Sequence, residues 1–180
     1  ENGGAWSGIN VRATDSTASD AILITAVDTG YVVRVTGVIA QYSSTTQFEI
    51  GIAGGGLWNA DVIVEVLDDR GSRPDPTEIN LDDLVAGEPT DDIPEAQYWE
   101  GAYVVINDAT VGSVTKNTST GRYTWTILDG AGNSIGVYDQ SVYFRGGSQG
   151  LDPDWAPPAP GTTLSLIRGV ISSSGQGIVI

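Results

Sequence analysis

Short runs of alternating apolar and polar residues dominate the chain, and glycine-rich or polar turns separate them. Alternation with a period of two is typical of strands that bury one face. The abundant valine and isoleucine also favour strands over helices. Strands are expected at residues 7–12, 31–42, 46–50, 60–67, 102–107 (continued after a kink by 109–114), 122–128, 134–138, 164–171 and 176–180. The pattern therefore predicts an all-β protein.

The stretch 68–97 has a different character from the rest of the chain. It contains four prolines and ten acidic residues, with one helical turn expected at 81–85. Such a composition is typical of a linker. We therefore expect an N-terminal β module at 1–67, an acidic, proline-rich linker at 68–97 and a C-terminal β module at 98–180.

The two predicted modules contain an internal repeat. The run 33–50 resembles the run 165–179, because each has a strand with a central glycine, a polar turn and a returning strand. The central glycines are Gly37 and Gly169. A glycine inside a strand permits the sharp bend that closes a small barrel. The repeat thus predicts two related barrels in tandem.

The C-terminal module resembles the OB-fold-like modules of secreted bacterial proteins, which occur beside extracellular nuclease and lamin-tail domains. The resemblance rests on the order of four short motifs, 100–104 (Glu-Gly-Ala-Tyr-Val), 105–111 (Val-Ile-Asn-Asp-Ala-Thr-Val), 125–132 (Trp-Thr-Ile-Leu-Asp-Gly-Ala-Gly) and 167–171 (Ile-Arg-Gly-Val-Ile). It covers residues 98–180 and, as a partial copy, residues 6–50. Such modules are accessory, so the resemblance implies two tandem OB-like barrel or sandwich modules and no catalytic residue.

The N-terminal copy is shorter than the C-terminal one. Two strands, at 101–114 and 122–128, precede the strand 134–138, whereas the corresponding strand 7–11 stands almost at the start of the sequence. Two strands of a five-stranded barrel are therefore missing from the first module. Residues 57–67 could fill the gap within the chain. Alternatively, a neighbouring subunit could add a strand, which would join copies head to tail into a filament.

Composition argues against several classes of function. The net charge is −15, and only 8 residues are basic, which disfavours nucleic acid and anionic lipid as partners. Histidine and cysteine are both absent, which excludes His-based triads and zinc sites, so we do not expect an enzyme. No apolar run approaches the ~20 residues of a membrane span. The sequence has no methionine and no apolar leader, which is the pattern of a processed, extracellular chain.

Three acidic pairs are candidate ligands for calcium, the cation that carboxylate oxygens suit best in so acidic a chain. The pairs are Asp68 with Asp69, Asp82 with Asp83, and Asp152 with Asp154. None of them fits the spacing of an EF-hand loop. The alternative is that these residues cap helices or carry solvated linker charge.

The chain contains five tryptophans and seven tyrosines that could stack on a ligand. Tyr123 and Trp125 fall on one face of a predicted strand, so they are candidates for a stacking face that binds a sugar or a base. Packing in the core or between modules is the alternative. A glycosylation sequon lies in a turn at Asn117.

These observations together predict a non-catalytic structural protein of a cell surface or extracellular matrix. It would form filaments with copies of itself, by strand complementation or by end-to-end docking. Candidate residues of the assembly interface are Trp6, Ile9, Val11, Ile178 and Ile180. The alternative function is an accessory carbohydrate- or protein-binding module of a secreted hydrolase or nuclease.

Overall fold

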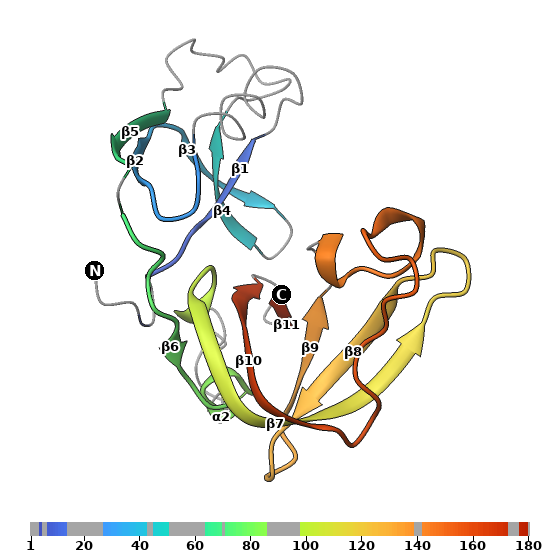
Figure 1. The fold of residues 1–180 in the computed structure, drawn as a ribbon. Coiled ribbons are helices and arrows are strands. Elements are labelled where there is room, and N and C mark those ends of the chain that lie inside the picture. The colour runs from blue at the N-terminus through green and yellow to red at the C-terminus, as the bar shows by residue number, and fades with distance from the viewer. Residues whose placement is uncertain are drawn as a thin grey trace. The chain divides into compact units, whose positions relative to one another are not determined.

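The chain forms two compact β units (Figure 1). The computed structural model describes residue 4 and residues 7–13, 27–42, 45–50, 64–69, 71–85, 98–138, 142–172 and 177–179. Unit 1 comprises Glu1–Gly8 and Pro76–Ile180, and unit 2 comprises Ile9–Asp75. Strands predominate, as the alternating pattern predicts, and the all-β class is confirmed. Among the described residues, no helix is long and apolar enough to cross a membrane.

Unit 1 contains six described strands. They are β6 (Thr77–Glu78), β7 (Tyr103–Lys116), β8 (Tyr123–Leu128), β9 (Ser134–Tyr138), β10 (Thr163–Ser172) and β11 (Gly177–Val179). The pairings follow the order β7–β8–β9–β11–β10, and β10 pairs in turn with β7. All these pairs are antiparallel except β9 with β11, which is parallel. The short β6 adds a parallel neighbour to the first half of β7.

Strand β7 curves strongly along its length (Figure 1), and Asp108, where the sequence predicts a kink, has a φ of 52°. The buried positions change phase there, from Val104 and Ile106 to Ala109 and Val111. The register with β10 nevertheless stays constant across the bend, with Ile106 opposite Ile167 and Ala109 opposite Leu164. Both strands therefore bend together, and the sheet folds over its own core.

The hydrophobic core of unit 1 draws on the five strands β7 to β11 and on residues that follow β6. Its buried residues are Ile79, Leu81, Leu84, Ala102, Val104, Ile106, Ala109, Val111, Trp125, Ile127, Ile135, Val137, Ile167, Ile171 and Ile178. The first three belong to the stretch that we expected to be a linker. The helix α2 (Asp82–Val85) begins directly after Leu81 and contains Leu84, and the spacing of three residues places those two side chains on one face. Residues 76–85 therefore fold with the second module rather than connecting two modules.

Unit 2 has five described strands in two sheets. They are β1 (Asn10–Ala13), β2 (Val32–Val35), β3 (Val38–Tyr42), β4 (Thr45–Ile50) and β5 (Val64–Asp68). One sheet has the order β1–β4–β3, and the other consists of β2 and β5. The single strand expected at 31–42 is thus interrupted at Thr36 and Gly37, and its halves join different sheets. The predicted hairpin of β3 with β4 is confirmed.

The sequence repeat corresponds to a repeat of strand pairing. In unit 2, β4 pairs parallel with β1 and antiparallel with β3. In unit 1, β11 pairs in the same way with β9 and β10. The strand β5 pairs antiparallel with β2, as β7 does with β10. Part of the run 57–67 therefore supplies one of the two missing strands within the chain.

Candidate functional site

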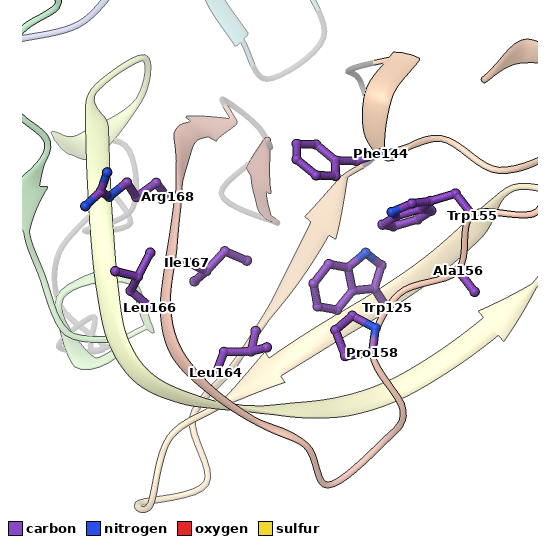
Figure 2. Close-up of a pocket in the computed structure, with 9 residues that line it drawn as sticks. All are labelled: Trp125, Phe144, Trp155, Ala156, Pro158, Leu164, Leu166, Ile167 and Arg168. Carbon is purple, nitrogen blue, oxygen red and sulfur yellow. The ribbon is translucent and has the colours of Figure 1, made fainter. Parts of the chain in front are cut away.

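Unit 1 contains a pocket of about 440 Å³ at the connection between β9 and β10 (Figure 2). Strand β8 contributes Trp125 to the lining, and β10 contributes Leu164, Leu166, Ile167 and Arg168. The connection between β9 and β10 contributes Phe144, Trp155, Ala156 and Pro158. Figure 2 shows the three aromatic rings on one side and the aliphatic side chains of β10 on the other. The site is therefore an apolar pocket with an aromatic wall.

Trp125 is the most buried aromatic residue of this wall. Its side chain points inward from β8 and is only 3% exposed. Its indole Nε1 is buried, and no hydrogen-bond acceptor lies within reach of it. Buried N–H donors are nearly always paired, because an unpaired one loses its bond to water without compensation. The pocket therefore contains one polar group that the fold leaves unsatisfied.

Trp155 completes the aromatic wall from the irregular loop that follows η3 (Gly147–Gln149). Its ring lies 6.2 Å from Tyr123 and 6.1 Å from Phe144, both in edge-on geometry. Such edge-to-face pairs are a favoured aromatic arrangement. The Nζ atom of Lys116 lies 5.3 Å from the centre of the Tyr123 ring, which adds a cation–π contact at the outer end.

Backbone hydrogen bonds hold this loop in place. The amide of Gly147 donates to the carbonyl of Pro153 at 3.0 Å, and that of Trp155 donates to Asp152 at 3.1 Å. Gly147 has a φ of 76° and packs closely against the backbone of Thr120 and Gly121, so it has no room for a side chain. The loop that carries Trp155 is therefore a built part of unit 1.

The structure does not provide an open stacking face at Tyr123 and Trp125. The two residues share a face of β8, as predicted, but it is the inner face, and Trp125 is buried in the core. A flat ligand cannot stack on a ring that the protein already covers. Trp125 therefore packs in the core, which was the alternative interpretation. What Trp125 can contribute to a binding site is an unpaired N–H group rather than an exposed ring.

Three of the candidate calcium ligands accept hydrogen bonds from the protein itself, two from nearby backbone and one from a distant side chain. Asp83 accepts the backbone N–H of Asn80 at 2.8 Å, which caps α2. Asp152 accepts the N–H of Asp154 at 3.0 Å within a turn. Asp82 accepts a hydrogen bond from Asn133. In the part of the chain that the structure describes, no three acidic residues gather as a metal site would require, and Asp68 and Asp69 follow one another at the end of β5.

The candidate interface residues fall into different environments. Ile9 and Val11, at β1, are 49% and 36% exposed, as an interface residue must be in a free subunit. Ile178 is fully buried in the core of unit 1, so its assignment to an interface was wrong. The alternating pattern could not tell an inward position from an outward one at the end of the chain. Trp6 and Ile180 lie outside the described residues.

Exposed apolar residues also occur on the sheets of unit 2. On β5, Val66 is 38% and Leu67 is 50% exposed, although successive residues of a strand face opposite sides. Val32, Val38 and Ile39 are also exposed. Sequence reasoning named the two residues at β1 but missed those on β5, because alternation there indicated one buried face.

The turn 117–121 contains the sequon. The side-chain oxygen of Asn117 accepts hydrogen bonds from the N–H groups of Ser119 at 2.9 Å and Thr120 at 3.1 Å, so this oxygen stabilises the turn.

Comparison with known proteins assigns no function to these sites. No protein-family model matches the chain, and no curated protein has significant sequence similarity to it.

Proposed function

We propose that this chain is a non-catalytic, extracellular structural subunit that assembles with copies of itself through unit 2. The observation that carries the proposal is the pairing repeat between the units. Each of the strands β9 and β7 in unit 1 has β8 as a second neighbour. Their counterparts β1 and β5 have no such neighbour among the described strands. Among the described strands, one strand position of the repeat is therefore unfilled.

The residues at this position suit an added strand. Ile9 and Val11 flank it on one side, and Val66 and Leu67 on the other, all of them exposed. Unpaired strand edges bearing apolar side chains are templates for pairing with another chain. In such an assembly each copy receives a strand from one neighbour and gives a strand to the other neighbour. Because this head-to-tail contact does not close into a ring, it builds a filament.

The same pairing supports the OB-like nature of both units. The cycle β7–β8–β9–β11–β10 is the arrangement expected of a five-stranded, partly open Greek-key barrel. We propose that unit 1 is an OB-like module and that unit 2 is a second one lacking the equivalent of β8. The absence of histidine and cysteine supports a non-catalytic role.

Electrostatics makes the assembly dependent on salt. The net charge of −15 means that copies repel one another over roughly the Debye length, about 10 Å at 0.1 M salt. Higher ionic strength or calcium screens this repulsion. Assembly should therefore be weakest in dilute buffer.

The test is light scattering after size exclusion, with negative-stain electron microscopy, over a range of protein and salt concentrations. We expect species that grow with concentration and appear as regular filaments. Ile9→Lys and Leu67→Lys should keep the chain monomeric, because a buried lysine in the contact is costly. The matched control is Leu151→Lys in unit 1, since Leu151 is 65% exposed in a loop away from the strands. A wild-type chain that stays monomeric under every condition rules the proposal out.

A further inference from the structure

The pocket of unit 1 is a second feature, independent of assembly through unit 2. From its lining we infer that this pocket binds a small, flat apolar molecule that carries a carbonyl or carboxylate oxygen, with Trp125 Nε1 as the hydrogen-bond donor. The volume of about 440 Å³ lies within the range of pockets that enclose small ligands.

The polar character of the lining side chains defines the class of ligand. Six of the nine lining residues are aliphatic, proline or phenylalanine and offer no polar atom. The other three, Trp125, Trp155 and Arg168, carry N–H groups and no acceptor. A sugar needs partners that accept from its hydroxyl groups as well as partners that donate. A donor-only lining instead favours a molecule whose polar atoms only accept.

The buried indole places that acceptor. Trp125 Nε1 has no hydrogen-bond partner among the residues that the structure describes, and Figure 2 shows the nitrogen on the side of the ring that faces Phe144 and Trp155. An oxygen that reached it from this side would satisfy a buried N–H donor that is otherwise unpaired. The rings of Phe144 and Trp155 would pack against the flat body of the ligand, and Leu164 and Ile167 would cover its opposite side.

The experiment uses the indole N–H signals of the full ¹⁵N-labelled chain, which has five tryptophans. The probes are acetophenone and benzoate, which carry the acceptor, toluene, which lacks it, and cellobiose. We expect acetophenone or benzoate to move the Trp125 signal downfield and saturably, while toluene and cellobiose do not. The variant Trp125→Phe assigns the signal and should weaken binding of the acceptor probes roughly 3- to 10-fold, the worth of one hydrogen bond.

A second variant keeps the test decisive if Trp125→Phe does not fold. Ala156 lines the pocket but is exposed, so Ala156→Phe should fill the mouth and abolish the shift without disturbing the core. Ala131→Phe, at an exposed position in the turn after β8, is the matched control and should bind as the wild type does. Absence of a saturable shift with both acceptor probes, or an unchanged shift in Ala156→Phe, overturns the inference. Binding of cellobiose alone would favour a sugar site instead.

Discussion

At the scale of single residues, the turn after β8 shows how one carboxylate can organise a loop. Asp129 accepts the N–H of Ala131 at 2.9 Å, the N–H of Asn133 at 2.8 Å and the side-chain amide of Asn133 at 2.7 Å. The hydrogen bond from the Asn133 side chain is the largest cause of a lowered pKa at Asp129, and the backbone bonds add to it. The charged form of this carboxyl is thus favoured by folding.

The pKa of Asp129 gives a prediction with a definite sign. Because the pKa is lowered in the folded state, the stabilisation is present above the ordinary value of 3.8 and is lost as the pH falls through the folded value. Asp129→Ala should therefore lower the Tm at pH 7, and the difference from wild type should shrink below about pH 3.8. Thermal melts followed by circular dichroism between pH 7 and pH 2 measure this. A Tm difference between Asp129→Ala and wild type that is the same at pH 7 and at pH 2 would contradict the assignment.

At the scale of elements, a bulge makes β7 fit both of its neighbours. The register of β7 against β8 shifts between Val111 and Val114, so β7 carries one extra residue there. The backbone N–H of Ser113 donates to Thr126 Oγ1 at 3.0 Å, which ties the bulge to β8. Gly112 sits in this bulge, and a Cβ atom there would meet Thr126 Oγ1 at 2.5 Å and Leu128 Cδ2 at 2.8 Å. Any side chain at this position would therefore have to displace the side chains of Thr126 and Leu128.

Replacing that glycine tests the fit of the bulge. We expect Gly112→Ala to lower the free energy of unfolding of unit 1 by about 1–3 kcal/mol, the usual cost of forcing an extra methyl group into a packed site. Gly130→Ala is the matched control, because a Cβ atom at Gly130 meets nothing within 4 Å. Urea unfolding followed by tryptophan fluorescence compares the two. Equal stability of both variants would show that the strands absorb the methyl group by shifting.

At the scale of the whole molecule, the two units differ in how much apolar surface they bury. Unit 1 has a core of fifteen buried hydrophobic residues. In unit 2, none of the residues whose burial is described is buried, and several valines and isoleucines are exposed. Regions with few buried apolar contacts open more readily than the core of the same protein. Unit 2 should therefore be the less stable unit in a free subunit.

Hydrogen exchange by mass spectrometry checks this difference. In dilute, monomeric protein we expect amides of β2, β3 and β4 to exchange faster than those of β7, β8 and β10 by on the order of tenfold, which is about 1.4 kcal/mol in opening free energy. Assembly should slow exchange in β1 and β5, whose open edges the next copy would cover, and leave β8 unchanged. Protection that rises in β8 instead would place the contact on unit 1.

The local pattern of the sequence determined the fold class, the strands of unit 1 and the repeat. These predictions are possible because side chains along a half-buried strand alternate between the two faces of the sheet, so the sequence shows a period of two whichever strand lies beside it. The kink at Asp108 and the hairpin of β3 with β4 were readable for the same local reason. No comparable signal distinguishes an inner face from an outer one, so the sequence leaves Trp125 as a candidate either for a stacking face or for the core, and it names Ile178 as a candidate interface residue although Ile178 is buried.

Only the tertiary structure decided which segments meet. Ile79, Leu81 and Leu84 lie among prolines and acidic residues, and their place in the core depends on β7 and β9 offering them an apolar surface. The break at Thr36 and Gly37 sends β2 and β3 to different sheets, because β3 pairs with the adjacent β4 whereas β2 pairs with the distant β5. The pocket likewise gathers Trp125, Trp155 and Ile167 across more than forty residues of sequence. Closure of a sheet is a long-range property, since each strand satisfies its backbone only when remote strands arrive beside it.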